Sequence, residues 1–141
     1  MQGRVLQYLP DGKMNNVDLR EGFSLGGNEI VLVTASDRTR KAIAIYRLDT
    51  DARRLVDVAD GMQPTDLDDP YGLCMYRSAT SGKTYVFINS GEGPLNQWEL
   101  VDAGGHRRVC REHAARRRQW ARARGAGART DVRDPDRGLR G

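Results

Sequence analysis

An arginine and a glutamate occupy matching places in two similar stretches of this 141-residue chain. Arg38 follows Ser36 by two positions, and Glu92 follows Ser90 by two positions. An arginine side chain presents a planar fork of donors that fits phosphate oxygens, and a carboxylate is a hard ligand that suits calcium. The pair therefore predicts a site for a phosphorylated ligand and a cation, against the simpler interpretation that both side chains are solvated turn residues.

Short segments rich in β-branched and aromatic residues surround these two positions. Turn residues such as Asp-Gly or Ser-Gly-Lys separate one such segment from the next. No longer segment within residues 1–104 keeps the apolar period of a helix. The sequence therefore predicts an all-β fold. The predicted strands cover residues 4–9, 29–35, 42–48, 54–59, 71–77, 84–89 and 95–101.

The predicted strands fall into two similar units. In each unit an apolar strand ends in a serine and a polar loop, and the next strand contains an aromatic residue two positions before a leucine. The units recur after about 50 residues, a period that is typical of a four-stranded β-propeller blade. Because such rings close with roughly four to eight blades, about two blades cannot close one. The equivalence of the units places Arg38 and Glu92 on one rim of neighbouring blades.

The composition is that of an ordinary globular domain, with 38% hydrophobic and 30% charged residues. No apolar run has the length of a membrane span or the pattern of a signal peptide, so we expect no membrane partner. The two cysteines, Cys74 and Cys110, form neither a disulfide framework nor a structural zinc site, which leaves the redox compartment open.

The charge changes abruptly near residue 104, where we place a domain boundary. Residues 1–104 carry a net charge of −4, whereas residues 105–141 carry 12 arginines, no lysine and 4 acidic residues, a net charge of +8. With so few large apolar side chains, residues 105–141 are expected to form a disordered, low-complexity tail. Three interpretations stay open: an arm that binds nucleic acid, a solvated natural tail, and a frameshift product of GC-rich DNA, which we favour over a nucleic-acid partner.

Five blocks within residues 3–102 occur in the order and at the spacing that are typical of β-propeller phytases. The first block contains Asn-Asn-Val-Asp, and the last places Gly-Glu-Gly ahead of Asn-Gln-Trp-Glu-Leu. Residues 1–104 therefore resemble part of a β-propeller phytase of the Bacillus, 3-phytase-like type. The blocks are residues 12–20, 35–38, 42–46, 71–73 and 91–100.

The resemblance implies a six-bladed propeller, extracellular or periplasmic, that uses calcium to hydrolyse the phosphomonoesters of phytate, myo-inositol hexakisphosphate. By position, Arg38 resembles the phosphate-binding arginine, Tyr71 the phosphate-contacting tyrosine, and Glu92 the catalytic acid at the calcium and substrate cleft. Val17, in a turn formed by Asn-Asn-Val-Asp, resembles a calcium contact made through a backbone carbonyl.

Two features set this chain apart from the family pattern. Position 91 is glycine, where Bacillus-type members have lysine, and the family's further acidic ligands lie in segments without a counterpart here. We therefore expect a phytase fragment that is inactive alone. The alternative is a non-enzymatic propeller fragment that serves as a binding module.

Overall fold

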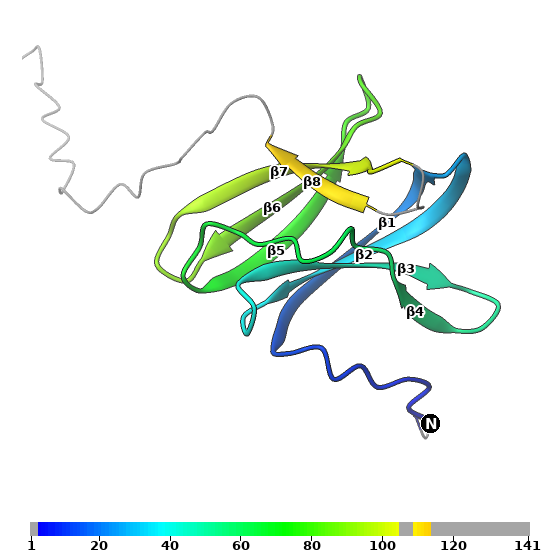
Figure 1. Cartoon of the computed structure of the whole chain (residues 1–141), viewed down its shortest axis with the longest axis horizontal. Coiled ribbons are helices and arrows are strands. Elements are labelled where there is room, and N and C mark those ends of the chain that lie inside the picture. The colour runs from blue at the N-terminus through cyan, green and yellow to red at the C-terminus, as the bar shows by residue number, and fades with distance from the viewer. Residues whose placement is uncertain (1–2, 105–108, 114–141) are drawn as a thin grey trace, which may run out of the picture.

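The computed structural model describes residues 3–104 and 109–113, which form two four-stranded antiparallel sheets (Figure 1). In each sheet the strands lie side by side in sequence order. Sheet A contains β1 (Met14–Leu25), β2 (Asn28–Asp37), β3 (Ala42–Asp49) and β4 (Arg54–Asp57). Sheet B contains β5 (Pro70–Arg77), β6 (Thr84–Ser90), β7 (Leu95–Asp102) and β8 (Val109–His113). The predicted all-β fold is confirmed, and each sheet has the four-stranded make-up of a propeller blade.

Local sequence explains the hairpins and the strand faces. Leu25 of β1 pairs with Asn28 of β2 across Gly26 and Gly27, whose φ angles are 59° and 80°. Two consecutive positive φ angles define a type I′ turn, which matches the twist of the flanking strands and favours glycine. Along β6, residues alternate between buried and half-buried, as expected for a strand with one face on a core.

The core lies between the facing surfaces of the two sheets. Trp98 is only 1% exposed, and it belongs to one continuous apolar cluster with residues from both sheets. No helix in residues 3–104 or 109–113 is long and apolar enough to cross a membrane. The central members of the cluster are Leu32, Ile43 and Ile45 of sheet A, and Leu73, Met75, Val86, Ile88, Trp98 and Leu100 of sheet B.

The strand predicted for residues 4–9 is wrong. This segment is irregular and leads into β1 without pairing in either sheet (Figure 1). Val5 and Tyr8 are each 82% exposed, so the apolar residues that suggested a strand do not pack on a core. The side-chain amide of Gln7 instead accepts a hydrogen bond from the Leu55 N–H (2.7 Å) and donates one to the Leu55 carbonyl (2.9 Å), which covers part of the edge of β4.

The turn predicted around Val17 is also wrong, because these residues belong to β1. Val17 pairs with Ala35 of β2, and the register shifts between Met14 and Val17 and again between Arg20 and Phe23. The strand was missed because its polar residues look like loop residues in the sequence. Irregularities of this kind let a strand bend and carry polar side chains to specific places.

β8 is a strand that the sequence analysis did not predict, and it lies within the segment expected to be a tail. It pairs with β7 from Asp102↔Val109 to Trp98↔His113 and completes sheet B. The rest of the predicted tail, residues 105–108 and 114–141, lies outside the described residues, and the domain boundary at residue 104 stays a prediction.

The two sheets are joined by side chains of β1 that bond to the backbone of β5. These are the edge strands of sheets A and B, so their outward backbone groups have no partner strand in their own sheet. The Met75 N–H donates to Asp18 Oδ2 (2.8 Å), and Arg20 Nη2 donates to the Met75 carbonyl (2.7 Å). Arg20 Nη1 also pairs with Asp18 Oδ1 at 2.8 Å. We call these three residues the Asp18 clamp.

Hydrogen bonds set the ionisation of Asp18. Burial alone would raise its pKa, but the amide donors of Met75 and Leu19 and the neighbouring Arg20 outweigh burial, so the pKa of Asp18 lies below its ordinary value.

A second link joins the sheets at the other end of β5. The Ser36 hydroxyl donates to the Tyr71 carbonyl (2.8 Å) and accepts the Asn16 N–H (3.0 Å). Asn15 Nδ2 donates to the same carbonyl (3.0 Å). Ser36 is fully buried, so its hydroxyl bridges β1, β2 and β5 away from solvent.

Replacing Asp18 by asparagine should destabilise the chain at pH 7 by about 1.5–3 kcal/mol, the value of a hydrogen bond to a charged group. The measurement is urea unfolding followed by the fluorescence of Trp98 in a Trp120→Phe background. Because the folded pKa of Asp18 is lowered, its contribution is present above the unfolded pKa of about 3.9 and is lost as the pH falls through the folded pKa.

The matched control is Asp51→Asn, which removes an exposed acid from the turn between β3 and β4 and should change stability little. A difference between wild type and Asp18→Asn that stays constant from pH 7 to pH 2 would contradict the clamp.

Replacing Ser36 by alanine should leave the Asn16 N–H without its acceptor and cost about 1–3 kcal/mol. Amide hydrogen exchange should become faster along both β1 and β5. Ser90→Ala is the matched control, since Ser90 Oγ accepts the Glu92 N–H of its own turn and should affect only that turn. Exchange that accelerates equally in the two variants would rule out a special role of Ser36 between the sheets.

Candidate functional site

Arg38 lies directly after β2, and its side chain reaches from sheet A to the start of sheet B. The backbone N–H of Arg38 donates to the Lys13 carbonyl (3.0 Å), which fixes the backbone of Arg38 beside the beginning of β1. Arg38 Nε donates to Asp69 Oδ1 (2.9 Å), and Nη2 lies 3.4 Å from Asp69 Oδ2. The guanidinium carbon is 5.6 Å from the centre of the Tyr71 ring. Arg38 and Tyr71, both predicted site residues, are therefore in contact.

The connection between β4 and β5 delivers Asp69 and Tyr71 to this position. It runs along β3, where the Ile43 N–H donates to the Gln63 carbonyl (2.9 Å) and the Thr65 N–H to the Lys41 carbonyl (2.8 Å). The buried Leu67 anchors it in the core. The chain then enters β5, so the end of this connection is placed by packing on both sheets.

Glu92 follows β6 in a tight turn next to Asp69. The Gly91 N–H donates to the Asp69 carbonyl (3.2 Å), and the Glu92 N–H donates to Ser90 Oγ (3.1 Å). Asp69 thus contacts Arg38 through its carboxylate and the turn of Glu92 through its backbone. The predicted placement of Arg38 and Glu92 near one another is consistent with these contacts, while their roles stay predictions.

Val17 lies on β1, where it pairs with Ala35 of β2, and its side chain is exposed. The structure therefore brings Arg38 and Tyr71 together and places the Glu92 turn beside them through Asp69, while the calcium contact of Val17 stays a prediction.

The described residues do not fit calcium by themselves. Within residues 3–104, whose side chains the structure describes, no three histidine, cysteine, aspartate or glutamate side chains gather into a group that could hold a metal ion. Calcium takes roughly six to eight oxygen ligands, and the two predicted contacts, Glu92 and the Val17 carbonyl, fall short of that number. The nearest acid to Arg38, Asp69, is already paired with the guanidinium.

Asp69 is the contact residue to which the sequence analysis assigned no role. The run Asp66-Leu67-Asp68-Asp69 looks like a solvated acidic loop, and several acids in a row give no sign of which one has a partner. The only useful signal was its position, two residues before Tyr71.

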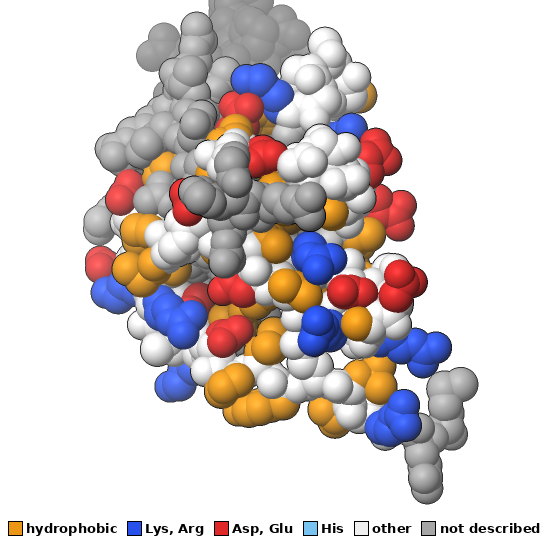
Figure 2. Space-filling view, turned by 45° about the vertical axis from the view of Figure 1, so that its right-hand side comes forward, with side chains coloured by type: hydrophobic (Ala, Val, Ile, Leu, Met, Phe, Trp, Pro, Cys, Tyr) orange, Lys and Arg blue, Asp and Glu red, His pale blue; other side chains and the backbone are white. Residues whose placement is uncertain are grey.

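Charged side chains of both signs lie at the site, where Arg38 pairs with Asp69 and Lys41 lies 3.5 Å from Asp68. On the face shown in Figure 2, acidic and basic side chains alternate with exposed apolar ones. A mixed surface does not attract polyanions as a whole, so a phosphate group would have to be recognised by individual side chains.

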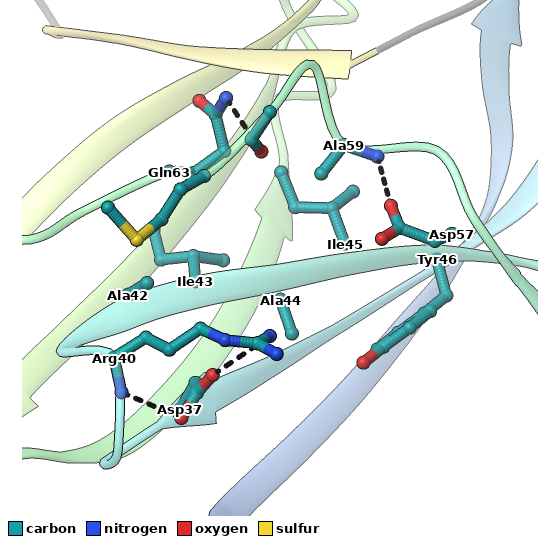
Figure 3. A pocket seen from close by; sticks show the side chains of 12 residues that line it. Asp37, Arg40, Ala42, Ile43, Ala44, Ile45, Tyr46, Asp57, Ala59 and Gln63 are labelled. Carbon is teal, nitrogen blue, oxygen red and sulfur yellow. Dashed lines mark hydrogen bonds and ion pairs between the residues drawn. The ribbon is translucent and has the colours of Figure 1, made fainter. Parts of the chain in front are cut away.

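A separate cavity of about 260 Å³ lies over β3 and is lined by Arg40, Tyr46 and Asp57 among others (Figure 3). Its polar side chains already have partners. Asp37, almost fully buried, accepts the N–H groups of Thr39 (2.9 Å) and Arg40 (3.1 Å) and lies 3.5 Å from Arg40 Nη1. The Tyr46 hydroxyl donates to Asp11 (2.8 Å), and burial together with this acid raises the pKa of Tyr46 above its ordinary value. These contacts are structural, so we place the candidate site at Arg38.

Comparison with known proteins gives the chain a family. The family model described as Phytase matches residues 1–117. The 3-phytase of Bacillus subtilis (strain 168) is 34% identical over an alignment of 108 residues, and the match covers 74% of this chain and 28% of that protein. The chain thus spans less than a third of the length of this relative. The extent of the family match and the identity to the 3-phytase agree with the order of the sequence blocks, and the chain belongs to the phytase family.

Proposed function

We propose that this chain supplies a phosphate-binding rim of a phytase, an enzyme that hydrolyses the phosphomonoesters of phytate. The observation that carries the proposal is the contact of Arg38 with Tyr71, beside the turn of Glu92. Membership of the phytase family supports the substrate class.

Arg38 is the group in this rim with the chemistry to bind a phosphate. Its guanidinium can donate two parallel hydrogen bonds to phosphate oxygens, and such charge-assisted pairs are roughly twice as strong as neutral ones. The Tyr71 ring packs against the guanidinium and limits the directions it can take. We propose that Glu92 supplies the acidic group of the cleft. Calcium, when bound, would neutralise phosphate charge, and the described residues alone do not supply its ligands.

The alternative is a binding module without turnover. Gly91 supplies no cation next to Glu92, and the described residues lack a metal-holding group, which favours this alternative for the chain alone. The two proposals differ in whether phosphate is released.

The isolated chain should release no phosphate, or nearly none, from phytate. The reason is the incomplete set of oxygen ligands among the described residues. The assay measures inorganic phosphate over time across a series of calcium concentrations, with the Bacillus subtilis 3-phytase as the positive control. Sustained turnover by the purified chain that an Arg38→Ala variant lacks would show that the chain is an enzyme by itself.

The role of Arg38 can be tested in a chimera that carries the other segments of the Bacillus subtilis 3-phytase. In it, the matching 108 residues of the Bacillus subtilis 3-phytase are replaced by those of this chain. Arg38→Ala should lower kcat/KM for phytate roughly ten- to a hundredfold, the effect of losing about 1.5–3 kcal/mol of charge-assisted hydrogen bonding. Arg38→Lys should restore activity only in part, because a point charge does not reproduce the fork.

The control for this series is Arg53→Ala, which removes an exposed arginine from the turn between β3 and β4. If Arg38→Ala and Arg53→Ala both leave kcat/KM unchanged in an active chimera, Arg38 is a surface residue and its assignment is wrong.

A further inference from the structure

Asp69 is the partner that fixes the direction of the Arg38 side chain. Its two carboxylate oxygens lie 2.9 Å from Arg38 Nε and 3.4 Å from Nη2. This contact uses the side edge of the guanidinium. Nη1 has no hydrogen-bond partner among the described residues, so the end of the guanidinium stays open.

We propose that Asp69 is a positioning residue, which holds Arg38 so that the open end of its guanidinium points at a phosphate group of the ligand. This inference rests on the proposed function. A phosphate bound at that end would make two parallel hydrogen bonds with Nη1 and Nη2 while the side edge stays on Asp69. Arg38 would then bind its ligand without releasing its partner.

The placement of Asp69 suits such a role, because its backbone is held independently of its carboxylate. Its carbonyl accepts the Gly91 N–H at 3.2 Å, and the next residue, Pro70, is buried and pairs with Ser90 of β6. A proline also restricts the backbone of the residue before it. The carboxylate is therefore carried on a fixed support rather than on a free loop.

Glycine at position 91 leaves room for this arrangement. A Cβ atom at that position would lie 3.3 Å from Asp69 Oδ2, closer than most such contacts. The absence of a side chain thus allows the carboxylate to lie against the turn of Glu92 while it pairs with Arg38.

The small free energy expected of the Arg38–Asp69 ion pair indicates that the pair orients Arg38 rather than stabilises the fold. The side chains of Arg38 and Asp69 are 41% and 43% exposed. Pairs this accessible contribute little to folding, since solvent screens the attraction. Losing the pair should therefore change the freedom of Arg38 far more than the stability of the chain.

An opposite effect of Asp69 is possible on electrostatic grounds, and the experiment separates the two. A carboxylate beside Arg38 also repels a phosphate. If repulsion dominates, removing Asp69 strengthens binding; if positioning dominates, removing it weakens binding.

The experiment is a titration of the full 141-residue chain with phytate, followed by the NMR signals of Arg38 Nε–H and the Gly91 amide. Site-resolved signals are needed because the 12 arginines of residues 105–141 would also attract phytate. Asp69→Ala should weaken binding at the site about two- to tenfold, the cost of ordering one long side chain on binding. Asp69→Asn, which keeps one acceptor for Nε, should fall between Asp69→Ala and wild type.

Asp68→Ala is the matched control. It removes the same charge one residue earlier, but the Asp68 carboxylate is fully exposed and lies 3.5 Å from Lys41 rather than beside Arg38. Its effect should be nil or a slight tightening. The inference is overturned if Asp69→Ala binds as tightly as Asp68→Ala, or more tightly than wild type.

Arg38→Ala separates failure of this inference from failure of the proposed function. If Arg38→Ala does not weaken phytate binding at the Gly91 amide, the proposed phosphate-binding rim fails. If Arg38→Ala abolishes binding while Asp69→Ala and Asp68→Ala behave alike, only the role of Asp69 fails. Should Asp69→Ala not fold, a change of the Arg38 Nε–H signal in Asp69→Asn without ligand reports the contact directly, and an unchanged signal contradicts it.

Discussion

The structure depends on how two edge strands, β1 and β5, meet without forming a β-ladder. Their outward backbone groups need partners, and water is largely excluded from the space between two packed sheets. Side chains of sheet A provide the partners: Asp18 and Arg20 bond to Met75, and Ser36 bonds to Tyr71. These bonds have direction, whereas the hydrophobic attraction between the two sheets is non-directional. The core therefore supplies the attraction between the sheets, and the polar bonds set their alignment.

The same bonds determine where the candidate site lies. Tyr71 is held through its carbonyl by sheet A, so its ring stays at the boundary where Arg38 arrives from the end of β2. Asp69 lies two residues earlier and is therefore held at the same boundary. Its carboxylate contacts Arg38, and its carbonyl accepts the Gly91 N–H. An exposed ion pair contributes little to the stability of the fold. Its geometry can still be well defined when the backbones of both paired residues are held by rigid neighbouring elements. The Arg38–Asp69 pair can thus have a defined geometry although it contributes little to the stability of the fold.

The strands that occur in both repeated units could be predicted from the sequence, whereas the residues that make a contact in only one unit could not. Strands β2, β3, β6 and β7 were predicted because apolar alternation and turn residues recur in both units. β1 was missed because Asp18 and Arg20 have the composition of a loop, although their polarity serves the contact with β5. Asp69 was missed for a related reason, since a run of acids does not show which carboxylate has a partner. Residues 4–9 were predicted as a strand but are irregular, because a strand-like composition does not form a strand where no neighbouring strand is available for pairing.

The two serines show why a repeat predicts position better than chemistry. Ser36 and Ser90 occupy matching places, and each accepts a backbone N–H, from Asn16 and from Glu92. Only Ser36 also donates to a carbonyl of the other sheet, because only sheet A has a following sheet among the described residues. The same local sequence therefore closes a turn in one unit and joins two units in the other. Arg38 and Glu92 differ in the same way: Arg38 pairs with Asp69 in the connection that follows its sheet, whereas no side-chain hydrogen bond or ion pair of Glu92 is found among the described residues. The candidate site is thus built from both sheets, with Arg38 from the end of sheet A and with Tyr71 and the turn of Glu92 from sheet B.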